Sequence, residues 1–222
     1  MSEPYIFLSA RNKSTRLKNK QLLRLSCGLT TTEFLLRRLK ATGLKVVFTT
    51  SWEPDDEVFD SLCSKYNTPI FHGHPIDKLV RYQAAMEKFE RDKAIIVDGD
   101  DILVSLEAIE KTRKALEDGY NYTYFEDVPD GLYCYGFTLN ALDKIILDKQ
   151  VEDTEIWGKL FKNKFKEKVL NLDEFRIPRD LRLTMDYKED FDFINSIIKN
   201  HKDCLINLSD LLEKDSVKNI NI

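Results

Sequence analysis

A strand-like run that passes directly into a basic loop stands near the start of the chain: Tyr5-Ile6-Phe7-Leu8-Ser9-Ala10-Arg11-Asn12-Lys13-Ser14-Thr15-Arg16-Leu17-Lys18-Asn19-Lys20. The first residues are apolar and favour β structure, which is typical of a buried strand. The loop that follows holds five basic side chains and no acidic one. Burying these charges without partners would cost much free energy, so we expect the loop to bind an anion.

A polyphosphate suits this loop better than a single carboxylate, because it offers many acceptor oxygens at several positions. The hydroxyls of Ser14 and Thr15 add hydrogen-bond donors. A turning loop can also point several backbone N–H groups at one anion. The alternative is a basic loop that contacts only solvent, and the clustering of charge alone leaves both interpretations open.

Outward from this loop, strand-like and helix-like segments alternate, which predicts an α/β fold with a mostly parallel central sheet flanked by helices. We expect further strands at residues 46–49, 69–71, 94–97, 120–124, 132–137 and 181–185. The first helix begins at a capping box formed by Thr30 and Glu33 and ends at Gly43. Further helices are expected after Pro54 (apolar positions Val58, Leu62 and Tyr66), around Leu79 to Met86, and over residues 105–116, 139–147 and 188–199.

Length and composition limit the class of protein. The 222 residues predict one domain, and 34 Lys and Arg against 38 Asp and Glu give a net charge of −4, which argues against a nucleic-acid partner. There is no apolar run long enough to span a bilayer and no signal peptide, so we expect a cytoplasmic protein without a membrane partner. The four cysteines are far apart, which indicates reduced thiols rather than a zinc site or a disulfide framework.

An acidic turn, Asp98-Gly99-Asp100-Asp101, follows the apolar strand at residues 94–97. Ligands of open parallel sheets bind beyond the carboxyl ends of the strands, so this turn and the basic loop should open onto one edge. Proteins usually bind Mg²⁺ through one or two carboxylates together with substrate phosphates. The pair therefore predicts a magnesium–nucleotide site, with a simple turn as the alternative for the acidic residues.

Two other segments carry candidate ligands. Asp186 follows the strand-like residues 181–185 and is a second candidate for the metal, whereas Glu189 and Asp190 fit the acidic start of a helix. His72 and His74 have no third ligand nearby, which favours a loop or substrate-contacting role over a zinc site.

The segment from Gln150 to Asn171 is rich in Lys and Glu, with Trp157, Leu160, Phe161 and Phe165 at helical spacing. This pattern is typical of a surface helix, a lid or a partner-binding face. Aromatic residues in such a pattern are more often core or interface than a cofactor site.

The motif Ala10-Arg11-x-x-Ser14-Thr15-Arg16-Leu17-x-x-Lys20 resembles the nucleotide-binding loop of the cytidylyltransferases that make CMP-activated acidic sugars. The chain is most similar to the spore-coat polysaccharide branch, which is related to the CMP-ketodeoxyoctulosonate and acylneuraminate cytidylyltransferases. The match covers roughly residues 5 to 200 and continues in order through Val47–Ser51, Asp56, Phe71–His74, Leu79–Tyr82, Gly99-Asp100, Pro129–Leu132, Arg182–Asp186 and Glu189-Asp190.

The resemblance implies a Rossmann-like nucleotidyltransferase fold, with CTP and a small-molecule acceptor as partners, Mg²⁺ as cofactor and a homodimer as assembly. Residues 120–180 would form the acceptor-binding and dimerisation part. The catalytic residues would be Arg11, Lys20 and Asp100, and the metal ligands Asp100 and Asp186. The nucleotide-binding residues would be Ala10, Arg11, Ser14, Thr15, Arg16, Lys20, Thr50, Ser51, Arg81 and Asp98. The residues that contact the acceptor would be His72, His74, Tyr82, Tyr133 and Tyr135.

The expected reaction is transfer of CMP from CTP to a keto-sugar acid or a phosphorylated small molecule, with release of pyrophosphate, in surface-polysaccharide precursor synthesis. The chain departs from the family pattern where the acceptor should bind, at Tyr133-Cys134-Tyr135 and Thr154-Glu155-Ile156-Trp157. Two alternatives stay open. Asp98-Gly99-Asp100 matches the D-x-D motif of metal-dependent glycosyltransferases, and a degenerate relative could bind nucleotide without turnover.

Overall fold

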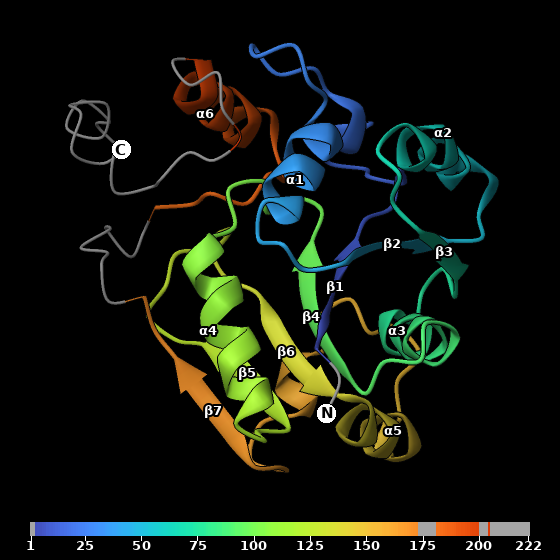
Figure 1. Cartoon of the computed structure of the whole chain (residues 1–222). Helices are drawn as coiled ribbons and strands as arrows, with labels where there is room; N and C mark the ends of the chain where they lie inside the picture. The colour runs from blue at the N-terminus through green and yellow to red at the C-terminus, as the bar shows by residue number, and fades with distance from the viewer. Residues whose placement is uncertain (1–2, 173–180, 200–203, 205–222) are drawn as a thin grey trace.

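One seven-stranded sheet, in the order β3-β2-β1-β4-β6-β5-β7, forms the centre of the protein (Figure 1). The computed structural model describes residues 3–172, 181–199 and 204. The strands are β1 (Tyr5–Ser9), β2 (Val46–Ser51), β3 (Ile70–Gly73), β4 (Lys93–Asp98), β5 (Tyr122–Phe125), β6 (Tyr135–Thr138) and β7 (Glu167–Leu170). The sequence-based expectation of an α/β fold is confirmed.

The sheet is mixed but mostly parallel. Strand β1 pairs in parallel with both β2 and β4, and β2 pairs in parallel with β3. Strand β6 runs antiparallel to β4 and β5, and β7 is parallel to β5. The strand order therefore reverses its direction between β1 and β4. Open α/β sheets bind their ligands at such a topological switch point.

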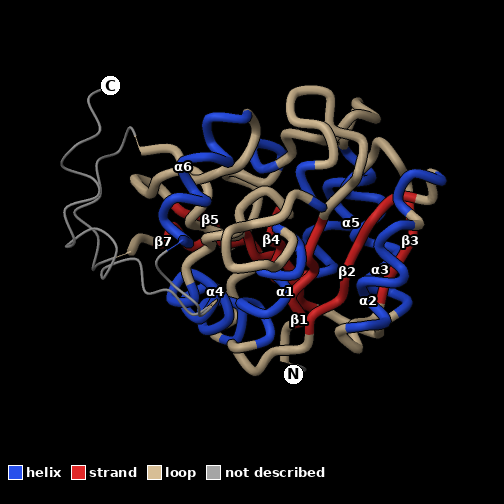
Figure 2. The backbone as a smooth tube through the Cα atoms, turned by 90° about the horizontal axis from the view of Figure 1, so that it is seen from above, coloured by secondary structure: helices blue, strands red, loops and turns tan. Residues whose placement is uncertain are grey.

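Helices cover both faces of the sheet (Figure 2). They are α1 (Thr31–Lys40), α2 (Val58–Lys65), α3 (Lys78–Lys88), α4 (Leu106–Glu117), α5 (Leu139–Asp148) and α6 (Lys188–Lys199), with short 3-10 turns at Lys20–Leu22, Pro54–Asp56 and Gly158–Leu160. Alternate residues of β1 point to opposite faces: Ile6 and Leu8 pack with α1, α2, α4 and α6, while Phe7 packs with α3 and α5. Each face is thus a separate apolar core.

Local hydrogen bonds fix where the helices begin. The predicted capping box is confirmed, because Glu33 N donates to Thr30 Oγ1 at 3.2 Å and Thr30 N donates to Glu33 Oε2 at 2.8 Å. Helix α3 begins after Asp77, whose Oδ1 accepts from Val80 N at 3.2 Å. Asp77 therefore determines where the first turn of α3, with Lys78, lies.

The prediction of a strand at residues 181–185 is wrong. This segment is irregular, with a bend at Thr184, and joins no ladder: Leu183 N donates to Asp130 O at 2.8 Å, and Met185 N donates to Asp100 O at 3.0 Å. Leu183 and Met185 are buried, so the apolar alternation reflects core packing without strand pairing. A Cβ on Gly131 would lie 2.2 Å from the carbonyl carbon of Leu183, and only glycine permits this crossing.

Of the interpretations of residues 150–171 as a surface helix, a lid or a partner-binding face, the surface helix is wrong. The segment contains only the Gly158–Leu160 turn and β7. Trp157 and Phe161 are buried against the aromatic rings of β5 and β6, with 4.8 Å between the ring centres of Tyr122 and Phe161. These aromatic residues are core, the alternative that the sequence left open, and they offer no exposed stripe to a partner.

Smaller differences concern α2 and β3. Val58 is exposed and Phe59 is buried in its place, so the apolar face of α2 is displaced by one residue from the expected one. His72 and Gly73 belong to β3 instead of the following loop. The cysteines Cys27, Cys63, Cys134 and Cys204 form no disulfide with one another. Across the part of the chain that the structure describes, no helix has the length and apolarity needed to cross a bilayer.

Candidate active site

A polar pocket of about 240 Å³ lies beyond the carboxyl ends of β1 and β4. The two strands are in register there, with Ser9 opposite Asp98, so the basic loop and the acidic turn leave the sheet side by side. Of the residues predicted to bind nucleotide or metal, the pocket brings together Ala10, Arg11, Ser14, Thr15, Arg16, Lys20, Arg81, Asp98 and Asp100. The expectation that both loops open onto one edge is confirmed.

Close packing under the pocket explains the small residues of the two loops. Gly99 N donates to Ser9 O at 2.8 Å, which joins the acidic turn to the end of β1. A Cβ on Gly99 would lie 2.6 Å from the Cβ of Ala10 and 3.0 Å from the amide of Gln21. A larger residue at Gly99 would therefore push the acidic turn away from the basic loop.

Lys20 is bound by two carboxylates, and these three residues with Arg16 and Arg182 are called the Lys20 cluster below. Its Nζ lies 2.7 Å from Asp100 Oδ2 and 3.0 Å from Asp186 Oδ1, although only 11% of its side chain is exposed. Asp186 also pairs with Arg16 at 2.8 Å and with Arg182 at 2.5 Å. The backbone bond from Met185 N to Asp100 O brings the two carboxylates together.

The charges of the Lys20 cluster stabilise one another. Burial alone would lower the pKa of Lys20, but the neighbouring Asp100 and Asp186 outweigh it and the pKa is raised. Burial likewise pushes the pKa of Asp186 upward, and hydrogen bonding and charge from Lys20, Arg16 and Arg182 bring it below its ordinary value. Both groups are therefore ionised at neutral pH.

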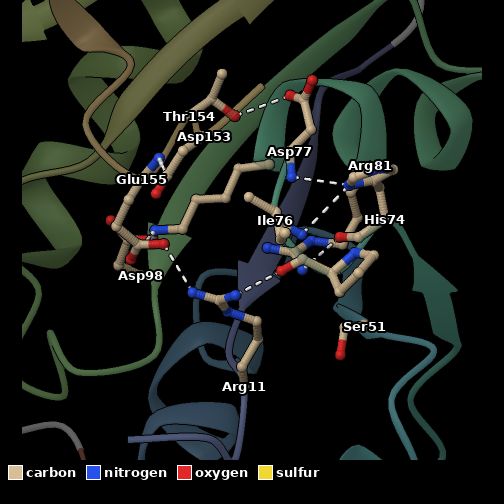
Figure 3. A network of polar contacts seen from close by, with 12 residues as sticks. Arg11, Ser51, His74, Ile76, Asp77, Arg81, Asp98, Asp153, Thr154 and Glu155 are labelled. Carbon is tan, nitrogen blue, oxygen red and sulfur yellow. Dashed lines mark hydrogen bonds and ion pairs between the residues drawn. The ribbon is translucent and has the colours of Figure 1, made fainter. Parts of the chain in front are cut away.

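A second ion cluster lies on the other side of the pocket and is called the Glu155 cluster below; it consists of Arg11, Lys78, Asp98 and Glu155 (Figure 3). Lys78 Nζ lies 3.2 Å from Asp98 Oδ1 and 3.0 Å from Glu155 Oε1. Arg11 Nη2 lies 2.8 Å from Glu155 Oε2. Burial raises the pKa of Asp98 despite the opposing charge of Lys78. Burial lowers the pKa of Lys78, but Asp98 and Glu155 raise it further than burial lowers it.

Arg81 is fully buried and only partly paired, although it lines the pocket. Its Nη1 donates to His74 O at 3.0 Å, while Nε and Nη2 have no hydrogen-bond partner among the described residues. Burial lowers the pKa of this guanidinium. Buried guanidinium N–H groups without partners are costly, so a ligand with acceptor atoms would stabilise Arg81.

Thr50 and Ser51 lie at the end of β2, outside the wall of the pocket. Asp56 accepts from Asn12 N at 2.6 Å and from Ser51 N at 3.1 Å, and so joins the basic loop to β2. Oγ1 of Thr50 and Oδ1 of Asn12 are buried without a hydrogen-bond partner in the described part of the chain. Asn12 directly follows Arg11 in the basic loop, and Thr50 precedes Ser51 at the end of β2.

The five residues predicted to contact the acceptor lie outside the wall of the pocket. His72 contacts Ser51 O at 3.0 Å, and His74 Nδ1 accepts from Asp77 N at 2.9 Å. Tyr82 is fully buried in the core between α3 and the sheet. Tyr133 donates to Asp130 Oδ1 at 3.0 Å, and the ring of Tyr135 lies 4.8 Å from that of Trp157.

The structure adds Lys78, Gln21 and Glu155 to the predicted residues of the pocket. Lys78 could have been found from the sequence because it directly follows Asp77. Aspartate is a favoured N-cap residue, so Lys78 would be the first residue of the helix after β3. Glu155 stands in an irregular segment whose path no periodic pattern specifies. Gln21 is a buried polar residue at the start of a 3-10 turn and carried no signal.

The donor set of the Lys20 cluster fits a magnesium ion. Carboxylate oxygens are the ligands that Mg²⁺ prefers, and one ammonium group already contacts both Asp100 and Asp186. The two carboxylates thus reach a single cationic position. The described residues contain no group of three or more His, Cys, Asp or Glu side chains suited to a metal. Mg²⁺ usually takes several of its ligands from substrate phosphates and water.

The fold, the switch point and the pocket of basic and acidic side chains define a nucleotidyltransferase. Residues 6–206 match the model of the family described as cytidylyltransferase, and the chain belongs to this family. The family supports nucleotidyl transfer with CTP as the activity. An uncharacterized protein of Methanocaldococcus jannaschii is 31% identical over 229 residues, which cover 96% of this chain and 92% of the relative.

Two solved structures share the fold. A cytidylyltransferase from Leptospira borgpetersenii serovar Hardjo-bovis has a TM-score of 0.89 at 24% identity, with 100% of this chain and 99% of that chain covered. CMP:2-keto-3-deoxy-manno-octonic acid synthetase, solved in complex with CTP, has a TM-score of 0.67 at 14% identity, with 90% and 99% covered. At these identities the likeness concerns the fold.

Proposed function

We propose that this cytidylyltransferase transfers CMP from CTP to an oxygen of a small anionic acceptor, either a keto-sugar acid or a phosphorylated small molecule, and releases pyrophosphate. We assign it to the synthesis of surface-polysaccharide precursors in the cytoplasm. The observation that carries the proposal is the Lys20 cluster, which places a buried ammonium group and two carboxylates beside the basic loop.

The chain's own residues bind the triphosphate and stabilise the charge that develops on it. Arg11, Arg16 and Lys20 line one pocket with the hydroxyl-bearing Ser14 and Thr15. Positive charge beside the β- and γ-phosphates stabilises the leaving pyrophosphate. Holding the acceptor oxygen close to the α-phosphate supplies a further large share of the acceleration.

Asp100 and Asp186 would hold Mg²⁺, which supplies positive charge to the phosphates when it is bound. Lys20 contacts both carboxylates. When Asp100 and Asp186 bind a metal ion instead, the ammonium group of Lys20 can turn towards a phosphate. Lys20 is therefore proposed to exchange a carboxylate for a phosphate oxygen on nucleotide binding.

The nucleotide base is proposed to lie on the Arg81 side of the pocket, towards β2. Among the described residues Arg81 has unpaired donors, and Thr50 at the end of β2 and Asn12 in the basic loop have unpaired oxygens. A cytosine ring presents both acceptor and donor atoms, so it can pair with groups of both kinds. Thr50 and Ser51 are assigned to nucleotide binding on this ground, with Asp56 fixing the backbone of Ser51.

An assay of pyrophosphate release tests the proposed reaction. The protein is incubated with Mg²⁺, one of the four ribonucleoside triphosphates and a panel of keto-sugar acids and phosphorylated sugars and polyols. We expect release with CTP and one acceptor class and little with the other nucleotides. Release of a nucleoside diphosphate from a sugar donor, with none of pyrophosphate from CTP, would establish a glycosyltransferase instead.

We also propose a homodimer. Trp157 and Phe161 are core residues, so support for an interface comes from Leu147, Val151 and Ile156, which are exposed large apolar residues near the same loop. Sedimentation at micromolar concentration should show twice the mass of the chain, and a monomer would rule out the dimer at that concentration.

A further inference from the structure

The carboxylate of Glu155 lies between two cations of the pocket wall (Figure 3). Its Oε2 is 2.8 Å from Arg11 Nη2 and its Oε1 is 3.0 Å from Lys78 Nζ, so each oxygen has its own cation. The Glu155 side chain is 52% exposed, compared with 29% for Arg11 and 10% for Lys78. The carboxylate therefore lies at the mouth of the pocket, above cations that are much less exposed.

Buried contacts on both sides fix the backbone that carries Glu155. Thr154 is buried and donates from Oγ1 to Asp77 Oδ1 at 2.8 Å, at the start of α3. Lys149 pairs with the other oxygen of Asp77, and Trp157 is buried in the core. The position of Glu155 over Arg11 and Lys78 is thus a property of the fold.

Both cations keep another partner when Glu155 moves away. Arg11 Nη1 donates to Pro75 O at 2.5 Å, and Lys78 lies 3.2 Å from Asp98. Burial pushes the pKa of Glu155 upward, but Lys78 and Arg11 outweigh it, so the group is charged at neutral pH. A half-exposed carboxylate regains water easily, and such ion pairs contribute little to stability. A substrate anion can therefore replace Glu155 at low cost.

We propose that Arg11 and Lys78 form an anion subsite, and that Glu155 is its built-in competitor, displaced when a phosphate or carboxylate group of a substrate binds. The inference rests on the proposed nucleotidyl transfer, because it assigns the subsite to one of the two substrates of that reaction. The arriving group is either a phosphate of the nucleotide or the ionised group of the acceptor. A neutral acceptor cannot displace Glu155, so the device selects for charged substrates.

Titration calorimetry with inorganic phosphate tests the competition. Wild type is compared with Glu155→Gln, which keeps the shape of the side chain and removes its charge. Glu152→Gln is the matched control, because Glu152 is an exposed acid of the same loop. We expect Glu155→Gln to bind inorganic phosphate on the order of fivefold more tightly than wild type, the gain expected from releasing a half-exposed ion pair, and Glu152→Gln to match wild type.

A second arm repeats the titration with saturating CTP and Mg²⁺ to identify the source of the anion. If the acceptor's group uses the subsite, Glu155→Gln still binds phosphate more tightly than wild type in the presence of CTP. If a nucleotide phosphate uses it, the gain appears in the affinity for CTP and phosphate no longer binds. Either result supports the competition. Equal affinities of Glu155→Gln and Glu152→Gln for both ligands would overturn it.

Lys78→Met provides an independent check. In combination with Glu155→Gln it should abolish the gain, because the gain depends on the ammonium group. Circular dichroism shows whether the double variant is folded. If the double variant does not fold, the comparison of Glu155→Gln with Glu152→Gln alone decides whether Glu155 competes with the anion. A protein that fails to bind CTP would refute the proposed function, while the phosphate arm without CTP would still test the subsite.

Discussion

The two ion clusters of the pocket are opposites in charge arrangement. In the Lys20 cluster one cation lies between two carboxylates, whereas in the Glu155 cluster one carboxylate lies between two cations. Loss of Lys20 leaves Asp100 and Asp186, of which Asp186 still pairs with Arg16 and Arg182. Loss of Glu155 leaves Arg11 and Lys78, of which Lys78 still pairs with Asp98. The first is therefore suited to receive a metal ion, and the second to receive an anion.

The difference in exposure separates their roles further. Lys20 is 11% exposed and Glu155 is 52% exposed, so the central cation is held tightly and the central carboxylate loosely. Charge effects are larger where water is excluded. Changes in the Lys20 cluster should therefore alter turnover strongly, while changes at Glu155 should alter ligand affinity modestly.

The largest effect is expected for Lys20→Ala. The change removes a charge-assisted contact to phosphate in a partly desolvated site and leaves Asp100 and Asp186 without their shared cation. We expect turnover to fall on the order of a hundredfold or more, with weaker CTP binding. Pyrophosphate release and titration calorimetry measure the two quantities.

Lys18→Ala is the matched control for Lys20→Ala. Lys18 belongs to the same basic loop but is exposed and lies outside the pocket wall. Its loss should change CTP affinity less than about threefold, as is usual for an exposed charge. Equal losses in the two variants would mean that the loop acts through its total charge, without a specific role for Lys20.

A second prediction concerns the carboxylates of the Lys20 cluster. Asp100→Asn and Asp186→Asn each keep the shape of the side chain and remove one charge, so each should remain folded and lose roughly tenfold to a hundredfold in turnover. Raising the Mg²⁺ concentration should partly rescue Asp186→Asn, which we take as the weaker ligand. Turnover measured against Mg²⁺ concentration, together with circular dichroism, checks both statements.

Asp98→Asn separates the two clusters. Asp98 contacts Lys78, and the metal is assigned to Asp100 and Asp186, so this variant should leave the Mg²⁺ concentration that gives half-maximal turnover unchanged. Full activity of Asp186→Asn would contradict the assignment of the metal to Asp100 and Asp186. A structure with CTP and Mg²⁺ in which the metal is bound to Asp98 and far from Asp186 would do the same.

The Lys20 cluster was largely predictable from the sequence, whereas in the Glu155 cluster Arg11 and Asp98 were predicted and Lys78 and Glu155 were not. Lys20 and Asp100 each follow a buried strand closely, and the α/β pattern determines that such loops meet at one edge. Asp186 was predicted for the wrong reason, because its segment crosses Gly131 without forming a strand. That crossing depends on one close backbone contact, which periodicity does not report.

The Glu155 cluster depends on an irregular segment. Thr154 bonds to Asp77 across 77 positions of sequence, and Trp157 is buried among rings of β5 and β6. Such contacts depend on the complete tertiary packing, and no local sequence pattern predicts them. The aromatic spacing instead suggested a surface helix, because apolar residues at three- and four-residue intervals occur in irregular core segments as well.

The smallest effect on turnover is expected for an ion cluster outside the pocket, around Glu33. This cluster allows a charge pair that only stabilises the fold to be compared with the charge pairs of the pocket. Glu33 Oε1 lies 2.7 Å from Lys65 Nζ, and Tyr66 donates to the same oxygen at 3.1 Å. Burial pushes the pKa of Glu33 up, but the hydrogen bonds from Lys65, the backbone of Thr30 and Tyr66 outweigh it and lower the pKa from 4.5 to about 2.

Because the folded protein holds the Glu33 carboxylate more acidic than the unfolded chain does, its stabilising effect is complete above pH 4.5 and is lost as the pH falls towards 2. Glu33→Gln should therefore lower the free energy of unfolding by about 1 kcal/mol at pH 7. The loss should be smaller at pH 3, because there the carboxyl of the unfolded chain is already largely protonated while that of the folded protein is still charged. Urea denaturation at both pH values measures the difference, with Glu87→Gln, an exposed helix acid, as control. Turnover per folded molecule should match wild type, since Glu33 lies outside the pocket wall. A loss of stability that is equal at pH 7 and pH 3 would show that Glu33 acts by shape and not by its charge.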